Sequence, residues 1–246
     1  MNLANEIQIQ NEVRDPLIVD REALVILDGM HRYNALKRIS CRLAPTCLVD
    51  YDDERIKVGA WYRVLKVDRS DSVATEALEA QHLNYNKREL IKFNRIDLAN
   101  AAIITEESVF ELTDYVDANS KLEWAVKLER FMARRGFSVQ YAAENIISET
   151  VTSNANVIIP VPIFTKAQIR ETARSARLLP HKVTRHVIPS RPLRLDVPLD
   201  LLRDHGLEEA NERLNELLST RHIDRKPPGS IVDGRRYQEE LLVFES

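Results

Sequence analysis

The residues best suited to chemistry form one short segment, Asp28 to Arg32, which reads Asp-Gly-Met-His-Arg. It lies where an apolar run ends and an amphipathic stretch begins, so the free N–H groups and the positive dipole end of a helix start would meet there. Gly29 permits a tight turn close to an anion, and His31 and Arg32 add donors. The segment predicts a phosphate-binding loop. The alternative is an ordinary turn and helix cap followed by two solvated basic residues.

The carboxylate of Asp28 would repel a bound phosphate unless a third group interacted with both of them. A divalent cation or a polarised hydroxyl group would do so. We therefore expect Asp28 and His31 to be the catalytic residues of this loop, with Asp28 also the candidate metal ligand.

A second cluster, residues 177–194, holds five Lys and Arg, two His and no acidic residue in a chain of net charge −3. It is interpreted as the far wall of an anion pocket, with Thr184 and His186 as hydrogen-bonding groups, as a nucleic-acid contact, or as a solvated basic loop. Trp61 is one of two tryptophans and is a candidate wall of a small-molecule pocket, although core packing is the commoner role.

Several classes of protein are excluded or disfavoured. The six glycines are too dispersed for a Gly-x-Gly-x-x-Gly or Walker A motif, and the six histidines lack metal-site spacing. Cys41 and Cys47 are too few for a disulfide framework and fit a reducing compartment. The longest apolar run, residues 23–27, is far too short for a membrane helix. We expect a soluble, cytoplasmic protein that does not bind a membrane.

The elements that must position these residues follow from hydrophobic periodicity. In the first part of the chain we expect strands at 17–19, 23–27 and 46–49 and a helix at 31–39. Beyond Trp61 we expect helical structure at 72–100, 120–134, 142–151, 165–176 and 198–218, the last broken near His205 and Gly206, a hairpin at 101–113 and a strand at 237–244. The run 157–164 is an edge strand at best, because Pro160 and Pro162 lack donors. The alternation of strands and helices predicts an α/β or α+β fold.

Three stretches together resemble a known family: VILDGMHRYNALKRI, APTCLVDYDDERIKVGAWY and KVTRHVIPSRPLRLDVPLDLL. They are similar to the free L-serine kinases, which include ADP-dependent archaeal enzymes and ATP-using bacterial enzymes of siderophore synthesis. The resemblance runs from about Pro16 to the C-terminal strand. It implies a ParB/sulfiredoxin-like nucleotide-binding domain at 1–63, N-terminally incomplete, and a second, smaller α/β domain at 64–246 whose 177–194 segment returns to the active site.

The resemblance also implies an activity. A kinase of this family transfers a phosphoryl group from ADP or ATP to the hydroxyl of free L-serine, giving O-phospho-L-serine, with Mg²⁺ on the phosphates. Carried across by position, Gly29, Met30, His31 and Arg32 match the phosphate loop, and Asp28 would meet Mg²⁺ through the nucleotide. Trp61, Thr184 and His186 match the serine-binding residues, and Arg185 lies between the last two. The choice between ADP and ATP, the oligomeric state and the pathway stay open.

Two departures from the family pattern stand out. The family's glutamate, thought to be the general base, lies in a segment that precedes the first residue of this chain, and neither Glu6 nor Glu12 is at the matching distance. Three expectations follow: an upstream extension, a base supplied differently, or binding without catalysis. At the other departure, Met30 stands where many relatives carry a histidine or valine. Sulfiredoxins need a cysteine at that place, which argues against reductase chemistry. The alternative function is a nucleotide-binding, ParB-like transcriptional regulator, although the chain offers little basic surface for nucleic acid.

Overall fold

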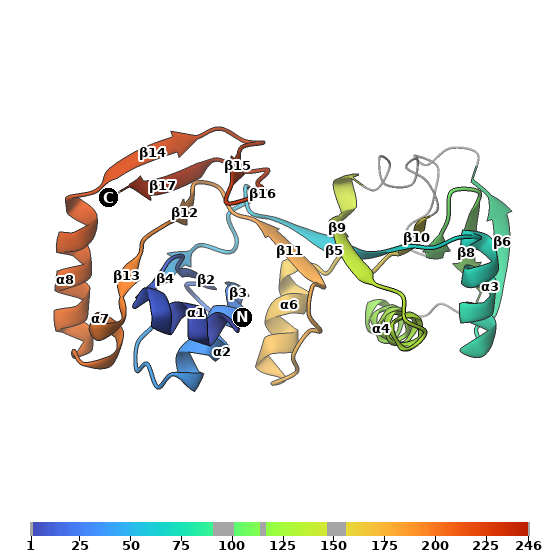
Figure 1. Ribbon diagram of the computed structural model, residues 1–246, viewed down its shortest axis with the longest axis horizontal. Coiled ribbons are helices and arrows are strands. Elements are labelled where there is room, and N and C mark those ends of the chain that lie inside the picture. The colour runs from blue at the N-terminus through green and yellow to red at the C-terminus, as the bar shows by residue number, and fades with distance from the viewer. Residues whose placement is uncertain (1, 91–100, 114–116, 147–155, 246) are drawn as a thin grey trace. The chain divides into compact units, whose positions relative to one another are not determined.

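The computed structural model describes residues 2–90, 101–113, 117–146 and 156–245. The chain divides into two compact units: unit 1 is Met1–Lys57 with His186–Ser246, and unit 2 is Val58–Arg185. The fold is mixed α/β, as expected (Figure 1). No helix in the described part of the chain is both long and apolar enough to span a membrane.

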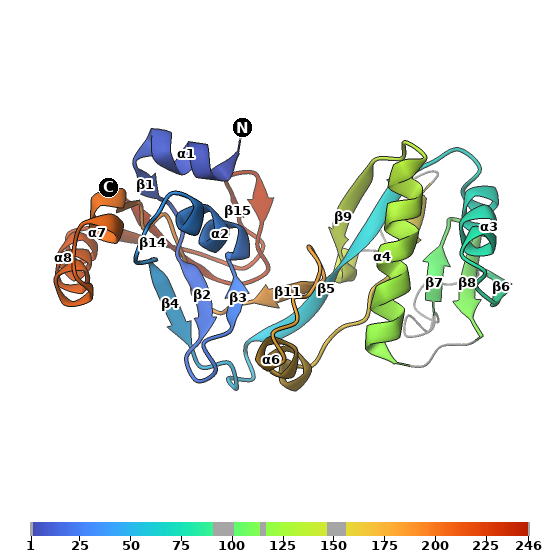
Figure 2. The same cartoon turned by 90° about the horizontal axis from the view of Figure 1, so that it is seen from below.

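The first half of unit 1 is a small sheet with two helices. Its elements are α1 (Leu3–Gln10), β1 (Glu12–Val13), β2 (Leu17–Asp20), β3 (Ile26–Asp28), α2 (Met30–Arg38) and β4 (Thr46–Val49). The fully buried strand β2 lies between β3, which runs antiparallel to it, and β4, which runs parallel (Figure 2). Asp28 is the last residue of β3 and Met30 the first of α2, so the predicted loop is the connection between them.

The C-terminal half of unit 1 completes its core. The elements are β12 (Arg191–Leu193), β13 (Val197–Pro198), α7 (Leu199–Arg203), α8 (Leu207–Ser219), β14 (His222–Lys226), β15 (Ile231–Val232), β16 (Arg235–Arg236) and β17 (Leu241–Glu245). Strand β17 pairs in parallel with β12 and antiparallel with β14, and β13 pairs with β1. Leu195, Val197 and Leu202 pack with Ile7 and Leu36 in one apolar cluster, so residues far apart in sequence share a core.

Unit 2 is built on a seven-stranded sheet of order β11-β5-β10-β7-β8-β6, with β9 also paired to β5. Its elements are β5 (Lys57–Lys66), α3 (Ser70–Ala80), β6 (Tyr85–Glu89), β7 (Ala101–Ile104), β8 (Ser108–Leu112), α4 (Ala118–Arg134), β9 (Val139–Ala143), the 3-10 turn η2 (Glu144–Ile146), β10 (Asn156–Ile159), α6 (Lys166–Arg174) and β11 (Thr184–Val187). The division between the units falls within β5 and within β11, whose residue His186 begins the second part of unit 1.

Most predicted elements are present, although the strands expected at 23–27 and 237–244 begin later, at Ile26 and Leu241, and three elements differ in kind or placement. The expected helix at 72–100 ends at Ala80 and is followed by β6, and the part at 91–100 lies outside the described residues. The expected helix at 142–151 begins instead as the end of β9 and a 3-10 turn, and its part at 147–151 is likewise not described. Strand β10 is interior, between β5 and β7, because it ends at Ile159 before the prolines begin. Helix α1 was not foreseen.

The domain division also differs from the expected 1–63 and 64–246. The last sixty or so residues join the first 57, because their apolar side chains complete the core around α1 and α2 rather than that of the central segment. Of the 177–194 segment, the part from His186 onward belongs to unit 1 and the part up to Arg185 to unit 2.

Candidate functional site

The loop between β3 and α2 has the backbone that an anion site needs. Gly29 is buried with φ +100°, and a Cβ there would lie 2.7 Å from Leu17 Cδ2, so no other residue fits easily. Helix α2 starts without a side-chain cap or an acidic residue in its first turn, whereas Asn2, Asp117 and Thr165 cap α1, α4 and α6. Its first N–H groups therefore have no partner within the helix and no capping side chain.

Asp28 is held as a carboxylate by two guanidinium groups. Its Oδ2 lies 2.7 Å from Arg191 Nη1 and 3.9 Å from Arg32 Nη2. Burial alone would raise the pKa of Asp28, but the charges of Arg191 and Arg32 outweigh it and hold this pKa below its ordinary value. Within the described chain, Oδ1 accepts no hydrogen bond, so this oxygen can receive a cation or a hydroxyl group.

Arg191 connects the loop to the second basic cluster. Its side chain is 3% exposed; Nε lies 2.7 Å from Glu239 Oε1, and Nη2 donates to the carbonyl of His186 at 2.8 Å. The structure thus brings Asp28 and His186 to one buried network inside unit 1. The sequence placed Arg191 in the basic cluster but could not assign its role, because its partners Asp28 and Glu239 lie 163 and 48 positions away.

His186 is buried and has a partner that sequence reasoning missed. Its Nε2 lies 2.8 Å from the hydroxyl of Tyr51, and the ring centroids are 5.5 Å apart. Tyr51 is 0% exposed and follows β4, so the hydroxyl cannot turn to water. The signal that could have identified it is an aromatic residue next to the charged run Asp50 to Arg55, inside the second of the quoted stretches.

The other loop residues differ in exposure. Met30 is 40% exposed and His31 is exposed in the first turn of α2. The half-buried Arg32 donates from Nη2 to the carbonyl of Pro16 at 2.9 Å, while its buried Nε has no hydrogen-bond partner among the described residues. A buried guanidinium nitrogen without an acceptor is costly, and a bound anion would remove that cost.

Trp61, Thr184 and Arg185 belong to unit 2, where they form a group of their own. The backbone N–H of Trp61 donates to the carbonyl of Val183 at 3.4 Å. The centroid of the indole ring lies 4.6 Å from Lys182 Nζ and 5.9 Å from Arg185 Cζ. Thr184, the first residue of β11, is half-buried. This arrangement places an indole face on β5, a hydroxyl and a guanidinium on β11, and the Lys182 ammonium in the turn just before β11.

Glu144, which the sequence reading did not single out, fixes this group. Its Oε1 accepts from Arg185 Nη2 at 3.1 Å, and its Oε2 accepts from the Ala60 N–H at 3.0 Å. A Cβ on Gly59 would lie 2.2 Å from Oε1, which explains the glycine before Ala60 and Trp61. Glu144 follows β9, whose pairing with β5 sets Ala143 opposite Trp61.

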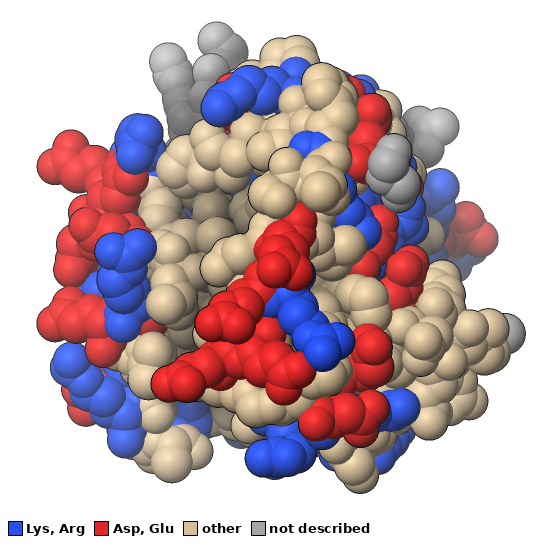
Figure 3. All heavy atoms as spheres, turned by 90° about the vertical axis from the view of Figure 1, so that its left-hand side faces the viewer, with Lys and Arg blue, Asp and Glu red and all other residues tan. Residues whose placement is uncertain are grey.

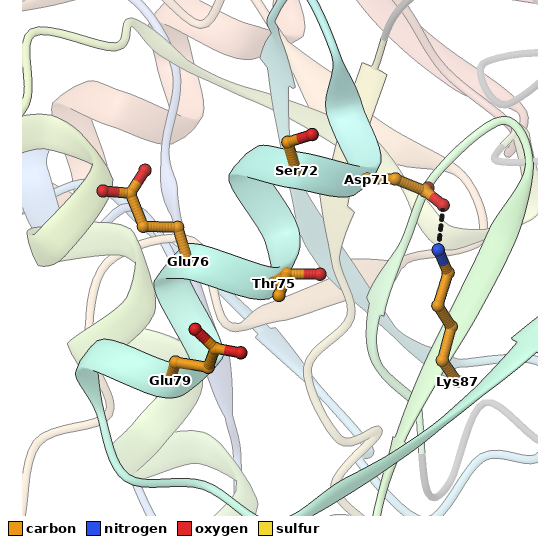
Figure 4. A pocket seen from close by; sticks show the side chains of 6 residues that line it. All are labelled: Asp71, Ser72, Thr75, Glu76, Glu79 and Lys87. Carbon is orange, nitrogen blue, oxygen red and sulfur yellow. Dashed lines mark ion pairs between the residues drawn. The ribbon is translucent and has the colours of Figure 1, made fainter.

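A separate hollow in unit 2 is lined by Asp71, Ser72, Thr75, Glu76, Glu79 and Lys87 (Figure 4). It contains no predicted site residue. The carboxylate of Asp71 is already bound by Lys87 Nζ at 2.7 Å and by the hydroxyl of Ser108 at 2.7 Å. The remaining carboxylates make it unsuited to a phosphate. In the described parts of the chain, no three His, Cys, Asp or Glu side chains are grouped to hold a metal.

The chain was compared with known proteins. No family model matches it. It is 24% identical over 173 residues to a ParB-like protein of Sulfolobus acidocaldarius, covering 70% of this chain and 73% of the relative. It is 23% identical over 178 residues to the ADP-dependent L-serine kinase SerK of Thermococcus kodakarensis, covering 72% and 73%. An ATP-dependent L-serine kinase of Staphylothermus marinus is 21% identical over 216 residues, covering 82% and 83%.

Solved structures give the same result for the fold. A free serine kinase variant in complex with ADP superposes with a TM-score of 0.62 at 21% identity, covering 81% of this chain and 84% of that one. SbnI from Staphylococcus aureus, truncated at its C-terminus, superposes with a TM-score of 0.65 at 17% identity, covering 88% and 86%. The resemblance expected from the three sequence stretches is confirmed: the chain is similar to the free L-serine kinases over most of its length and has their fold.

Proposed function

We propose that this protein is an L-serine kinase, which transfers a phosphoryl group from ADP or ATP to the hydroxyl of free L-serine to give O-phospho-L-serine. One observation carries the proposal beyond the comparisons. Asp28 of the phosphate loop and His186 of the distant basic segment meet at Arg191 inside unit 1. Phosphoryl transfer depends on positioning and charge neutralisation more than on covalent chemistry by the protein, and this network supplies both.

On the nucleotide side, the loop acts through backbone and charge. The first N–H groups of α2 and the side chains of His31 and Arg32 bind a phosphate group, and Gly29 lets it approach the backbone. Met30, being exposed, contributes its N–H rather than its side chain. Asp28 either anchors a metal on the phosphates or orients the serine hydroxyl, since Oδ1 has no partner in the described chain.

Mg²⁺ fits this loop only as a companion of the nucleotide. The described residues offer one ionised carboxylate, Asp28, rather than a cage of ligands. Mg²⁺ is typically held in this way, by one or two carboxylates together with substrate phosphates. When bound, it would neutralise charge on the transferred group.

On the amino-acid side, we assign Trp61, Thr184, Arg185 and His186 to serine. Thr184 and His186 are two apart on β11 and so face the same side of the strand, while Arg185 faces the other side, toward Glu144. Tyr51 fixes the ring of His186, so that one imidazole nitrogen has a defined partner and the other a defined direction.

The reaction itself is the direct test. The 246-residue chain, and in parallel a version extended upstream if the gene encodes one, is incubated with L-serine, Mg²⁺ and either ADP or ATP. Phosphoserine and the corresponding AMP or ADP are followed by ³¹P NMR. We expect stoichiometric formation of both products with at least one donor. No phosphoserine from either version with either donor would refute the kinase.

Two variants separate the two halves of the site. Arg32→Ala should weaken nucleotide binding by about 1.5–3 kcal/mol if the guanidinium holds a phosphate. Arg38→Ala, an exposed arginine in the last turn of the same helix, is the matched control and should change nothing. His186→Ala should raise the KM for serine more than that for nucleotide. Equal effects on both would contradict the assignment of His186 to serine.

A nucleotide-binding regulator is the second candidate, favoured by the similarity to a ParB-like protein. On the face drawn in Figure 3, acidic side chains gather near the centre and the basic side chains form no continuous patch. DNA affinity that falls steeply with salt would support the regulator, and no DNA binding at low salt would exclude it.

A further inference from the structure

The short hairpin of β15 and β16 reaches the network of the phosphate loop. Its residue Val232 and the following Tyr237 pack with Leu193, Leu241 and Val243 in a buried cluster. The Tyr237 N–H donates to the carbonyl of Ser230 at 3.0 Å, and its own carbonyl accepts from Gly229 at 2.8 Å. The hairpin is therefore anchored to the β12–β17 sheet, and the side chains on it have fixed positions.

Arg235 and Arg191 both lie over the ring of Tyr237. The Tyr237 ring centroid lies 4.6 Å from Arg235 Cζ and 6.0 Å from Arg191 Cζ. Arg191 in turn contacts Asp28 at 2.7 Å. Arg235 thus lies on the solvent side of a buried tyrosine, within the same group of side chains as the loop. Consistent with this position, Arg235 is the third arginine whose charge lowers the pKa of Asp28, after Arg191 and Arg32.

The three arginines differ in the acceptors that their guanidinium groups already contact. Arg191 is engaged by Asp28, Glu239 and the carbonyl of His186. Arg32 is partly engaged by the carbonyl of Pro16. Arg235 is exposed, and in the described part of the chain no carboxylate lies within ion-pair distance of it.

The neighbouring acidic residues reinforce the contrast. On the same hairpin, Asp233 pairs with Arg14 at 3.3 Å and with Arg194 at 2.7 Å. Burial raises the pKa of Tyr237 and the charge of Asp15 adds to this; Asp15 itself accepts a hydrogen bond from the Arg194 backbone N–H at 3.0 Å. These two acids therefore have other partners, and Arg235 is exposed with its guanidinium over the Tyr237 ring.

We propose that Arg235 binds a phosphate of the nucleotide beyond the α-phosphate, and so favours nucleoside di- and triphosphates over a monophosphate. The inference rests on the proposed nucleotide site. The start of α2 and Arg32 hold the phosphate nearest the loop, whereas Arg235, which shares the Tyr237 ring with Arg191, contacts the next phosphate along the nucleotide. A bidentate guanidinium–phosphate contact suits that role.

The test measures the affinity of the full chain for AMP and ADP by calorimetry at fixed ionic strength, with Mg²⁺ constant. We expect Arg235→Ala to weaken ADP binding about tenfold and AMP binding less than twofold, because one charge-assisted contact is lost only with ADP. Arg235→Lys should lose less ADP affinity than Arg235→Ala. Arg236→Ala removes a neighbouring exposed arginine whose side chain faces the other side of the strand, and should leave both affinities unchanged.

Each other outcome would overturn the inference. If Arg235→Ala lost AMP and ADP affinity equally, or lost neither, the inferred contact with the distal phosphate would be refuted. The proposed nucleotide site would not be affected by that result. If Arg236→Ala weakened ADP binding as much as Arg235→Ala does, the effect of Arg235 would be explained by general electrostatics alone and the inference would be wrong. Failure of the unaltered chain to bind either nucleotide would refute the proposed function and this inference together. Retained AMP binding in Arg235→Ala also shows that the variant is folded.

Discussion

Replacing Arg191 by methionine tests whether this buried arginine holds the two sequence clusters together. The change keeps an unbranched, flexible side chain but removes the guanidinium charge, so the carboxylates of Asp28 and Glu239 both lose this partner. Glu239 is 5% exposed and cannot turn to water, whereas Asp28 is 32% exposed and retains Arg32. Removing one member of a buried ion pair costs about 3–5 kcal/mol, and we expect about 3 kcal/mol because only Glu239 is left fully uncompensated.

The matched control is Arg194→Met, in the same segment. Arg194 pairs with Asp233 at 2.7 Å, but the side chains are 34% and 43% exposed. An exposed pair of this kind contributes less than about 1 kcal/mol. The double variant Arg191→Met with Glu239→Gln removes both charges and should recover much of the lost stability.

The assay must report on unit 1. Both tryptophans, Trp61 and Trp124, lie in unit 2, so their fluorescence does not follow the unit in question. Urea unfolding is therefore followed by amide hydrogen exchange of β2 and α2, with far-UV circular dichroism for the whole chain. If Arg191→Met costs no more than Arg194→Met, the network does not organise the site.

Three further predictions follow from individual contacts. Gly59→Ala should destabilise unit 2 by about 1–3 kcal/mol and raise the KM for serine, because the new Cβ would lie 2.2 Å from Glu144 Oε1. In the same urea titration, the control Gly206→Ala should leave the stability nearly unchanged, because no atom lies within 4 Å of its new Cβ. Tyr51→Phe should cost about 1 kcal/mol and raise the KM for serine but not for nucleotide in steady-state kinetics, since the hydroxyl is bonded to His186 at 2.8 Å. The folded-state pKa of Asp28 lies below its ordinary value of 3.8, so the contribution of its carboxylate to stability is complete above that pH and is lost as the pH falls through the folded value. Asp28→Asn should therefore flatten the dependence of the urea midpoint on acid pH. An unchanged pH profile in this variant would contradict the prediction.

Local physics was enough to predict the loop and most elements. An apolar run, Asp-Gly and an amphipathic stretch predict a strand, a tight turn and a helix without knowledge of the rest of the chain, and β3, Gly29 and α2 follow in that order. Strand β4 and the hairpin of β7 and β8 were likewise predicted from periodicity and turn residues. Composition and spacing sufficed to exclude a Walker A motif and a disulfide framework, because the six glycines are too dispersed and the two cysteines too few.

Tertiary structure alone decided which distant residues meet. Arg191, Tyr51, Glu239 and Glu144 have no local pattern that distinguishes them from other charged or aromatic residues, and their roles come from burial beside partners up to 163 positions away. The course of the chain after Ala80 and after Ala143 was also decided there, since pairing with β8 and β5 overrides a helical composition. The sequence carries short-range preferences, whereas the pKa of Asp28, the fixed ring of His186 and the joining of residues 186–246 to the first 57 depend on long-range packing that no single segment encodes.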